Sequence, residues 1–433
     1  MNIILLSGGS GKRLWPLSND IRSKQFIKIF KTADGDHASM VQRIYGQIKE
    51  VSPDATVTIA TGRSQVSAIH NQLGEDVGIS VEPARRDTFA AIALATAYLH
   101  DVMGVDRDDA VVVCPVDPLV EKEYFECVDR LWKTAKDGDK NLVLMGIDPT
   151  YPSEKYGYIK PVDGGYEFTE KPTAEKAAEY IENGALWNGG VFAYKLSYVL
   201  DKARELLGTS VYKELFDGYE GLKKISFDYA VVEQEKSIEV LKYSGVWKDL
   251  GTWNTLTEAM EEVSVGNAIM SDNCENVHVI NELDIPVFAM GVKNMVIAVS
   301  PDGILVSDKG QSSYIKPYVD AIDAQVMFAE KSWGSYRVLD VTDDSLTVKV
   351  TLNPSHSMNY HSHERRDETW TVVSGNGETV IDGVRKAVKA GDVIGIPAGT
   401  KHTVISGDET LVIIEVQTGK DISVHDKIKY DMP

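Results

Sequence analysis

The first 262 residues alternate short apolar runs, typical of β-strands, with longer helical stretches such as Val41–Glu50 and Phe89–Leu99. The apolar runs lack polar alternation, as expected for strands that are covered on both faces. These runs are Ile3–Leu6, Val57–Ala60, Val111–Val113 and Leu142–Met145. The alternation predicts a Rossmann-like α/β fold with a mixed, mostly parallel sheet and right-handed crossovers. Sites in such sheets lie beyond the carboxyl ends of the strands.

Two regions with a different pattern follow. From Gly266 to about Lys316, short β runs separated by turn residues predict a small all-β linker that resembles a short β-solenoid. From about Ala329 onward, longer strands joined by glycine-rich turns predict a jelly roll or barrel. We therefore expect three domains, at residues 1–262, 263–325 and 326–433.

The amino-acid composition indicates which partners the protein can bind and which cellular compartment it suits. The net charge of −20 argues against nucleic-acid binding, which depends on an excess of Lys and Arg. A local cluster such as Lys12, Arg13 and Lys24 can still attract a nucleotide. The three scattered cysteines form no disulfide or metal pattern, so we expect a reducing cytoplasm. No secretion signal is visible, and no stretch approaches the ~18 apolar residues of a membrane span, so we expect no membrane partner.

A glycine-rich loop, SGGSGKR, follows the first strand. It is not a P-loop, because Leu6 stands where the first glycine belongs and Arg13 where a hydroxyl belongs. It is not the dinucleotide fingerprint either, because Leu14 occupies the third glycine position. A strand, a glycine loop and two cations remain. That pattern fits a phosphate-binding loop or an ordinary βα turn.

Polar residues at four distant positions accompany this loop. Asp117 in CPVDP follows an apolar strand, and Asp249 lies in WKDLGTW. Two carboxylates at one sheet edge suit Mg²⁺ bound to substrate phosphates. Glu170 and Lys171 lie in FTEKPT, and Asn188 lies in LWNGGVFAY. Taken singly, each is more often a turn residue or a solvated charge pair.

Taken together, these motifs resemble the sugar nucleotidyltransferase family, and most closely its mannose-1-phosphate guanylyltransferase branch. The resemblance covers nearly all of residues 1–255. The matching pieces, in family order, are GGSGKRLWPLS, SKQF, EPARRDTFAAIALA, VDP, YGYI, EKP, WNGGVF, SFDYAVVE and KDLGTW. The resemblance implies transfer of a nucleotidyl group from an NTP to a sugar 1-phosphate, most simply GTP and mannose 1-phosphate, with release of pyrophosphate. It also implies a homo-oligomer, most simply a dimer.

The resemblance assigns a role to each matching residue. Arg13 and Lys24 would neutralise charge on the α-phosphate and the departing pyrophosphate. Asp117 and Asp249 would hold Mg²⁺. The nucleotide would be bound by Leu6, Gly8, Gly9, Ser10, Gly11, Lys12, Glu82 and Arg86. The sugar phosphate would be oriented by Gly157, Glu170, Lys171 and Asn188.

Five positions depart from the usual family residues. Lys12 replaces Thr, Ser23 replaces Pro, Val116 replaces Ala, Pro118 replaces His, and Asp87 replaces Asn in the stretch that lines the base pocket. These departures keep the substrates open at this stage. Another NTP such as CTP, or another hexose or heptose 1-phosphate, is the alternative.

The C-terminal region carries a metal-ligand pattern. His361 and His363 are two residues apart, so on a strand both side chains point to one side. Glu368 is five residues beyond His363, so the chain between them must bend or bulge. His402 follows a PAGTK turn on another strand. Three imidazoles and one carboxylate then converge on a site suited to Zn, Mn, Fe or Ni.

This pattern resembles the cupin superfamily. In the guanylyltransferase family, a cupin at this position is the mannose-6-phosphate isomerase of the bifunctional, type II enzymes. Four cations are candidates for phosphate binding or proton transfer: Lys331, Arg337, Arg365 and Arg366. The alternatives are a cupin that only binds sugar or stabilises the oligomer, and a regulatory subunit without chemistry. The presence of all four predicted catalytic residues disfavours the last.

Overall fold

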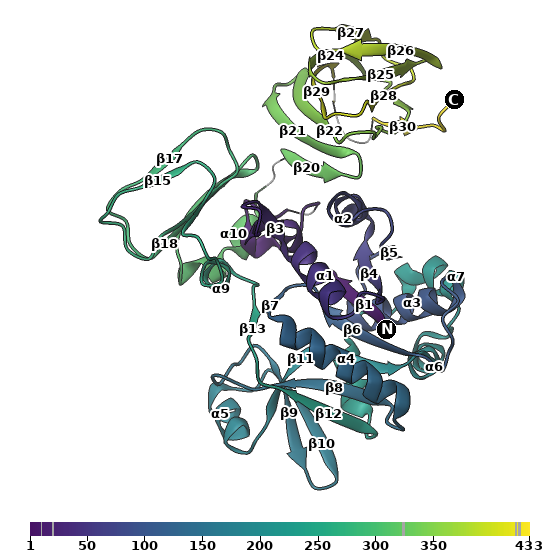
Figure 1. The fold of residues 1–433 in the computed structure, drawn as a ribbon, viewed down its shortest axis with the longest axis vertical. Helices are drawn as coiled ribbons and strands as arrows, with labels where there is room; N and C mark the ends of the chain where they lie inside the picture. Colours follow the sequence, from purple (N-terminus) through teal and green to yellow (C-terminus); the bar gives the residue numbers. More distant parts are fainter. Residues whose placement is uncertain (10, 20, 323–324, 421, 423–425) are drawn as a thin grey trace. The chain divides into compact units, whose positions relative to one another are not determined.

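The computed structural model describes residues 1–433 except 10, 20, 323–324, 421 and 423–425 (Figure 1). The chain forms two compact units. The first comprises Met1–Leu14, Ser23–Val66 and Leu73–Glu262, and the second comprises Trp15–Arg22, Ser67–Gln72 and Val263–Pro433. Two short segments of the N-terminal region therefore belong to the second unit.

A nine-stranded mixed sheet forms the centre of the first unit. Its strands are β1 (Asn2–Ser7), β4 (Thr56–Gly62), β5 (Gly78–Glu82), β6 (Ala110–Pro115), β8 (Leu142–Ile147), β9 (Gly157–Val162), β10 (Gly165–Glu170), β11 (Leu186–Lys195) and β12 (Ile238–Tyr243). β1 pairs in parallel with β4 and β6, and β4 with β5. β11 instead runs antiparallel to β6, β8 and β9. The predicted mixed α/β sheet is confirmed.

Helices alternate with these strands along residues 1–262. They are α1 (Met40–Val51), α2 (Val66–Leu73), which belongs mostly to the second unit, α3 (Asp87–Asp101), α4 (Lys122–Asp137), α5 (Ala174–Glu182), α6 (Leu196–Leu207), α7 (Tyr212–Asp217), α8 (Phe227–Ala230) and α9 (Trp253–Thr257). A capping box between Ser39 and Gln42 starts α1. α3 is apolar on nearly all faces because it packs against the sheet as well as against α6, α7 and α8.

Three strand pairings bring together polar residues from distant parts of the chain. β7 (Pro118–Val120) pairs with β13 (Trp247–Asp249), and this pairing sets Asp249 opposite Pro118. Asp117 immediately precedes Pro118, so two aspartates from distant parts of the chain become neighbours. In the sheet, Gly157 of β9 pairs with Glu170 of β10 on one side and with Asn188 of β11 on the other.

The second unit contains a short β region whose pairings are parallel except that of β18 with β19. Its strands are β14 (Ser264–Val265), β15 (Ala268–Met270), β16 (His278–Asn281), β17 (Val287–Ala289), β18 (Met295–Ser300) and β19 (Gly303–Asp308), followed by α10 (Lys316–Val319). β14, β16 and β18 pair in parallel, as do β15 and β17. Parallel ladders of consecutive short strands agree with the solenoid-like pattern in the sequence.

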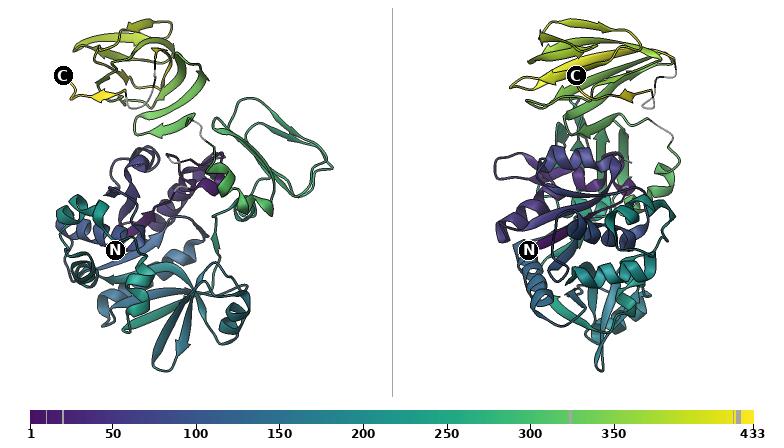
Figure 2. Two further views of the ribbon diagram at one scale, coloured as in Figure 1. Left: turned by 180° about the vertical axis from the view of Figure 1, so that it is seen from behind. Right: turned by 90° about the vertical axis from the view of Figure 1, so that its right-hand side faces the viewer.

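Two further sheets form the C-terminal part of the second unit (Figure 2). One has the order β20-β21-β22-β29-β24-β27 and the other β26-β25-β28-β23-β30. The strands are β20 (Phe328–Lys331), β21 (Gly334–Val341), β22 (Ser345–Leu352), β23 (His361–Ser362), β24 (Arg366–Ser374), β25 (Asn376–Ile381), β26 (Val384–Lys389), β27 (Val393–Ile396), β28 (His402–Ser406), β29 (Leu411–Gly419) and β30 (Ile428–Lys429). Trp370 is the largest fully buried side chain of their shared core. This arrangement confirms the predicted antiparallel jelly roll.

The segment Trp15–Arg22 packs within the second unit through a buried ion pair. The Arg22 guanidinium donates two hydrogen bonds of 2.8 Å to the Glu282 carboxylate. Asn19 Nδ2 donates to Asp302 Oδ2 at 2.7 Å, and Ser300 Oγ donates to the Pro16 carbonyl at 2.8 Å. No helix within the described residues is long and apolar enough to cross a membrane.

We predict that Arg22→Ala destabilises the second unit by about 3 kcal/mol, because it leaves Glu282 without its buried partner. Urea unfolding of Arg22→Ala, Glu282→Ala and the double variant measures this loss. The double variant should lose less than the sum of the two single variants. Arg337→Ala is the control, since Arg337 pairs at 3.4 Å with the exposed Asp284, and we expect a loss below about 1 kcal/mol. A loss in Arg22→Ala as small as in the control would contradict the prediction.

Candidate active site and histidine cluster

The glycine loop after β1 is shaped by the approach of another segment. Gly9 has φ 130° and Gly11 has φ 60°, both in the region that favours glycine. A Cβ atom on Gly11 would lie 2.7 Å from the backbone nitrogen of Lys24. Glycine is therefore required where the loop contacts the Lys24 segment. Ser10 lies outside the described residues.

Ser23 fixes this loop from the other side. Its hydroxyl donates to the Gly9 carbonyl at 2.8 Å, and Gln65 Nε2 donates to the same carbonyl at 3.3 Å. Gln65 Nε2 also lies 2.5 Å from Ser23 Oγ, which links the two contacts. Ser23 was singled out in the sequence as a departure from the usual proline. The structure gives this serine a hydrogen-bonding role that proline cannot fill.

Lys24 joins the two predicted metal-binding aspartates. Its ammonium nitrogen lies 2.6 Å from Asp117 Oδ2 and 3.7 Å from Asp249 Oδ1. The lysine is 16% exposed, whereas the two carboxylates are 35% and 42% exposed. The structure thus brings together three of the four predicted catalytic residues, with the carboxylates open toward solvent.

The electrostatics of this group leave room for a further cation. Burial alone would lower the pKa of Lys24, but attraction to Asp117 and Asp249 raises it above its usual value. Burial and the neighbouring Asp117 raise the pKa of Asp249, while Lys24 and Arg13 lower it and only partly compensate. Lys24 contacts both carboxylates, yet each carboxylate keeps about a third or more of its surface exposed. Such an oxygen-rich, partly exposed pair fits the ligand chemistry of Mg²⁺.

The predicted nucleotide-binding residues lie in several places. Leu6 and Gly8 flank the end of β1, and Lys12 and Arg13 lie in the 3₁₀ turn Lys12–Leu14. A Cβ atom on Gly8 would lie 4.0 Å from Glu82 Oε1, so Glu82 is next to the loop.

Glu82 and Arg86 also contact residues outside the glycine loop. Burial raises the pKa of Glu82, whose carboxylate accepts a hydrogen bond from Tyr219 Oη at 2.8 Å. Arg86 is hydrogen-bonded to the segment around Glu220. Its Nε donates to the Glu220 carbonyl at 3.0 Å. Asp87, the departure in this stretch, has φ 68°, a backbone conformation in which Asp and Asn are the favoured non-glycine residues.

The predicted sugar-phosphate residues form a row across three strands. Glu170, Gly157 and Asn188 lie side by side on β10, β9 and β11. A Cβ atom on Gly157 would overlap Glu170 Oε2, so a side chain there would displace the Glu170 carboxylate. Lys171 follows with φ 47°, and its ammonium lies 2.8 Å from Glu170 Oε1.

These residues line a pocket together with two acids that sequence reasoning gave no role. The pocket is bounded by Gly157, Glu170 and Asn188, and also by Asp228 and Glu233. Asp228 Oδ1 accepts a 2.6 Å hydrogen bond from Asn188 Nδ2. Burial is the main cause that raises the pKa of Asp228, to about 6, and nearby Glu170 contributes. The motif SFDYAVVE contains both acids, so the signal was present in the sequence but carried no assigned function.

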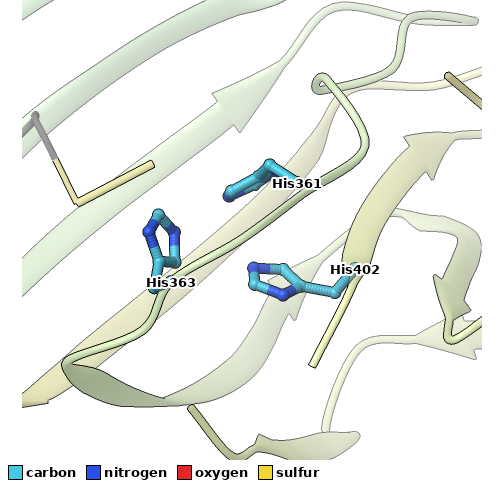
Figure 3. Close-up of side chains that lie close together, drawn as sticks. All are labelled: His361, His363 and His402. Carbon is cyan, nitrogen blue, oxygen red and sulfur yellow. The ribbon is translucent and has the colours of Figure 1, made fainter. Parts of the chain in front are cut away.

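A histidine cluster lies inside the C-terminal domain. His361, His363 and His402 are 3%, 2% and 1% exposed, and their possible ligand atoms lie within 4.8 Å of one another. Figure 3 shows the three rings turned toward a common centre. His361 on β23 pairs directly with His402 on β28. The predicted bend is present, because β23 ends at Ser362 and β24 begins at Arg366 in the other sheet.

Backbone carbonyls fix which ring nitrogen faces the cluster centre. The Nδ1 atom of His361 lies 2.6 Å from the Asn359 carbonyl, and that of His402 lies 2.8 Å from the Thr400 carbonyl. His363 Nδ1 makes the same contact with the Asp426 carbonyl. A carbonyl only accepts, so each Nδ1 carries a proton, and Nε2 is the nitrogen that remains to face a metal.

The donor atoms fit a transition metal. His402 Nε2 is buried and has no hydrogen-bond partner among the described residues. Burial and neighbouring positive groups lower the pKa of His361 to about 2, so its ring stays neutral. Neutral, inward-facing imidazoles are the ligands that Zn, Mn, Fe and Ni accept.

Glu368, the fourth predicted ligand, lies beside two of the rings. Its oxygens are 3.1 Å from His363 Nε2 and 3.2 Å from His402 Nε2. Trp370 Nε1 donates to Glu368 Oε2 at 3.1 Å, and Arg366 Nε lies 3.2 Å from Oε1. Arg366 therefore lies at the cluster, while the other candidate cations do not contact it in the described structure. They pair with Asp284 (Arg337), Asp426 (Arg365) and the Tyr336 ring (Lys331).

Sequence reasoning missed two further buried polar residues of this domain. Glu415 and Gln417 of β29 are 7% and 5% exposed and are hydrogen-bonded to each other. Burial, reinforced by Glu368, raises the pKa of Glu415 to about 7. Their alternation in IIEVQ, with polar side chains where the inner face should be apolar, was the available signal.

Comparisons with known proteins agree with this architecture. The sequence matches the nucleotidyl transferase family over residues 2–265 and the cupin domain family over residues 348–417. It is 28% identical to a mannose-1-phosphate guanylyltransferase of Escherichia coli, over 99% of this chain and 97% of that protein. It is also 28% identical to the alginate biosynthesis protein AlgA of Pseudomonas putida, over 99% of this chain and 95% of that protein.

One solved structure extends the similarity to three dimensions. The crystal structure of mannose-1-phosphate geranyltransferase from Thermus thermophilus superposes with a TM-score of 0.62. It has 28% sequence identity and covers 75% of this chain and 99% of its own. Because the family match spans more than half of the sequence, the chain belongs to the nucleotidyl transferase family and carries a C-terminal cupin domain.

Proposed function

We propose that this nucleotidyltransferase transfers a guanylyl group from GTP to mannose 1-phosphate, which yields GDP-mannose and pyrophosphate. The observation that carries the proposal is the position of Lys24, between Asp117 and Asp249 and against Gly11 of the glycine loop. Phosphoryl transfer uses cations beside the reacting phosphates and carboxylates that hold Mg²⁺, and this arrangement places both next to a loop suited to phosphate.

The reaction needs charge stabilisation and positioning rather than a general base. A phosphate oxygen of the sugar 1-phosphate attacks the α-phosphorus of the NTP. The bond from the α-phosphorus to the oxygen that bridges it to the β-phosphate breaks, and pyrophosphate leaves with the electron pair. The nucleophile is already an anion, so no proton has to be removed. The site therefore has to align two anions and offset the charge that builds on the phosphates.

Different residues of the chain align the substrates and offset the phosphate charge. The loop from Gly8 to Gly11 offers its backbone N–H groups to the triphosphate. Arg13 and Lys24 supply positive charge beside the reacting phosphates. The row of Glu170, Gly157 and Asn188 orients the sugar phosphate, with Lys171 next to it. When Mg²⁺ is bound by Asp117 and Asp249, it neutralises phosphate charge and orients the oxygens of the triphosphate.

The choice of GTP and mannose 1-phosphate is supported by the names of relatives that align along 99% of the chain. Another NTP such as CTP, or another hexose or heptose 1-phosphate, is the alternative, because Lys12, Asp87 and Pro118 depart from the usual family residues. We predict that a matrix of NTPs against sugar 1-phosphates, scored by pyrophosphate release, is most active with this pair. A faster rate with a different pair would reassign the substrates, and no release with any pair would refute nucleotidyl transfer.

We predict that Lys24→Ala and Asp249→Asn each lower the rate of pyrophosphate release by at least about 100-fold, because each removes charge that offsets or organises the phosphates. Circular dichroism and the melting temperature should stay close to those of the unmodified chain. Lys248→Ala is a matched control, since Lys248 precedes Asp249 in the chain but pairs with Glu258. Near-normal rates in either site variant would show that these residues are not catalytic.

For the cupin domain we propose that His361, His363, His402 and Glu368 bind one divalent metal and that the domain isomerises mannose 6-phosphate and fructose 6-phosphate. The buried polar groups of Arg366 and Glu415 favour this second activity, because they can contact a hydroxylated substrate where an inert barrel would be apolar. Isomerisation moves a proton between C2 and C1 of the sugar through an enediol. The bound metal would polarise the sugar oxygens. The alternative is a cupin that only binds sugar or stabilises the oligomer.

We predict that purified protein contains metal, and that His402→Ala lowers its metal affinity at least about tenfold by removing an inward-facing ligand. Elemental analysis measures this, and a chelator should lower the melting temperature of the unmodified chain more than that of the variant. His356→Ala is the control, since His356 is exposed and its Nδ1 contacts the Pro354 carbonyl. Equal metal content in both variants would refute the site, and metal-loaded protein without isomerase turnover would leave only the non-catalytic cupin.

Three expectations stand as proposals beside these activities. We propose that the chain works in the cytoplasm, that it assembles as a homodimer, and that residues 1–262, 263–325 and 326–433 are its three domains. The change from mixed α/β elements to short parallel strands after residue 262 supports the first boundary. Light scattering of the full chain measures the oligomeric state.

A further inference from the structure

The pocket beside the predicted sugar-phosphate residues has an acidic wall. Glu170 from β10 and Asp228 from α8 lie on opposite sides of the row formed by Gly157 and Asn188, and Glu233 follows α8 along the chain. Asp228 is partly buried, whereas Glu233 is exposed at the rim. Two of these acids, Asp228 and Glu233, are not among the residues that the family resemblance assigned to the site.

Asp228 controls the orientation of Asn188. The Asn188 side chain uses its oxygen to accept from the Gly190 N–H at 3.1 Å and its nitrogen to donate to Asp228 Oδ1 at 2.6 Å. With both ends engaged, the amide has one orientation, and one N–H remains for a ligand. Asp228 also lines the same pocket. Asp228 is thus placed both to fix Asn188 and to accept a hydrogen bond itself.

The charges around the pocket are unequal. Glu170, Asp228 and Glu233 influence one another electrostatically, and Lys171 is the nearby cation that pairs with Glu170. Carboxylates accept hydrogen bonds from hydroxyl groups strongly and repel other anions. A sugar ring with neutral hydroxyls suits this wall. A ring that carries its own carboxylate would add a like charge to three acids.

We propose that Asp228 and Glu233 are specificity-determining residues that bind hydroxyl groups of the sugar ring and exclude sugar 1-phosphates with an acidic ring substituent, such as uronic acid 1-phosphates. This inference rests on the proposed nucleotidyl transfer to a sugar 1-phosphate. It assigns the ring end of the substrate to the acids, and the phosphate end to Lys171 and the cations of the glycine loop.

The test compares Asp228→Asn and Glu233→Gln with the unmodified chain. Asparagine keeps the size of Asp228 and can still accept from Asn188, so the variant should fold. We expect the KM for mannose 1-phosphate to rise about tenfold or more in Asp228→Asn, because a charged acceptor is lost. The KM for the NTP should stay within about twofold, since the nucleotide loop is untouched. Glu233→Gln should show the same pattern with a smaller change, as expected for an exposed residue.

The second arm uses mannuronic acid 1-phosphate as the probe of charge exclusion. The unmodified enzyme should prefer mannose 1-phosphate by at least about 100-fold in kcat/KM, and the double variant should narrow that preference at least about tenfold. Glu167→Gln is the matched control, because Glu167 lies on β10 with Glu170 but pairs with Lys160 on the surface. It should change neither KM nor the preference.

The outcomes distinguish a failure of the proposed nucleotidyl transfer from a failure of the proposed role of Asp228 and Glu233. If no sugar 1-phosphate supports pyrophosphate release from the unmodified chain, the proposed function fails. If release is normal but Asp228→Asn leaves the KM for the sugar phosphate unchanged, or changes both KM values equally, the inference is wrong. If Asp228→Asn does not fold, the Glu233→Gln variant alone tests the proposal, through its preference for mannose 1-phosphate over mannuronic acid 1-phosphate. A preference equal to that of Glu167→Gln overturns the proposal.

Discussion

One ammonium group between two carboxylates organises the N-terminal site. Asp117 follows β6, Asp249 ends β13, and the pairing of β13 with β7 brings them together. Lys24 can reach both because its backbone packs directly on Gly11, where any side chain would collide. Ser23 then holds the Gly9 carbonyl and sets the path of the loop. Gly11, Ser23 and the pairing of β13 with β7 together place the Lys24 ammonium where three distant segments meet.

The fold was predictable where the local pattern determines it. Apolar runs without alternation identified β1, β4, β6 and β8, because central strands are covered on both faces. β11 was harder, because Asn188 and two glycines read as a tight turn. In the structure this stretch is a ten-residue strand whose register shifts between Asn188 and Phe192, with Gly190 at φ 69°. Glycine marks a bulge as readily as a turn, and only pairing with β8 and β9 distinguishes them.

Some features of the candidate sites were also predictable from the local sequence, and others were not. The spacing of His361 and His363 indicated a shared direction, and the structure also places His402 and Glu368 beside them. The carbonyls that hold each Nδ1 could not be foreseen, because they depend on loop conformation and not on residue type. The roles of Asp228 and Ser23 were missed for a related reason. These roles arise from hydrogen bonds to residues far along the chain, and neither residue type is distinctive by itself.

The net negative charge of the chain is unfavourable for the binding of anionic substrates. With a net charge of −20, the protein repels anionic substrates at a distance, so attraction must be local. The cations proposed to bind the phosphates are Arg13, Lys24 and Lys171, while acids line the pocket proposed for the sugar ring. A sugar 1-phosphate has a charged end and a neutral end, and this division of charge matches it in one orientation only. Reversing the substrate would place phosphate against Asp228 and Glu233, so the acids proposed to bind hydroxyls would also disfavour the reversed direction of binding.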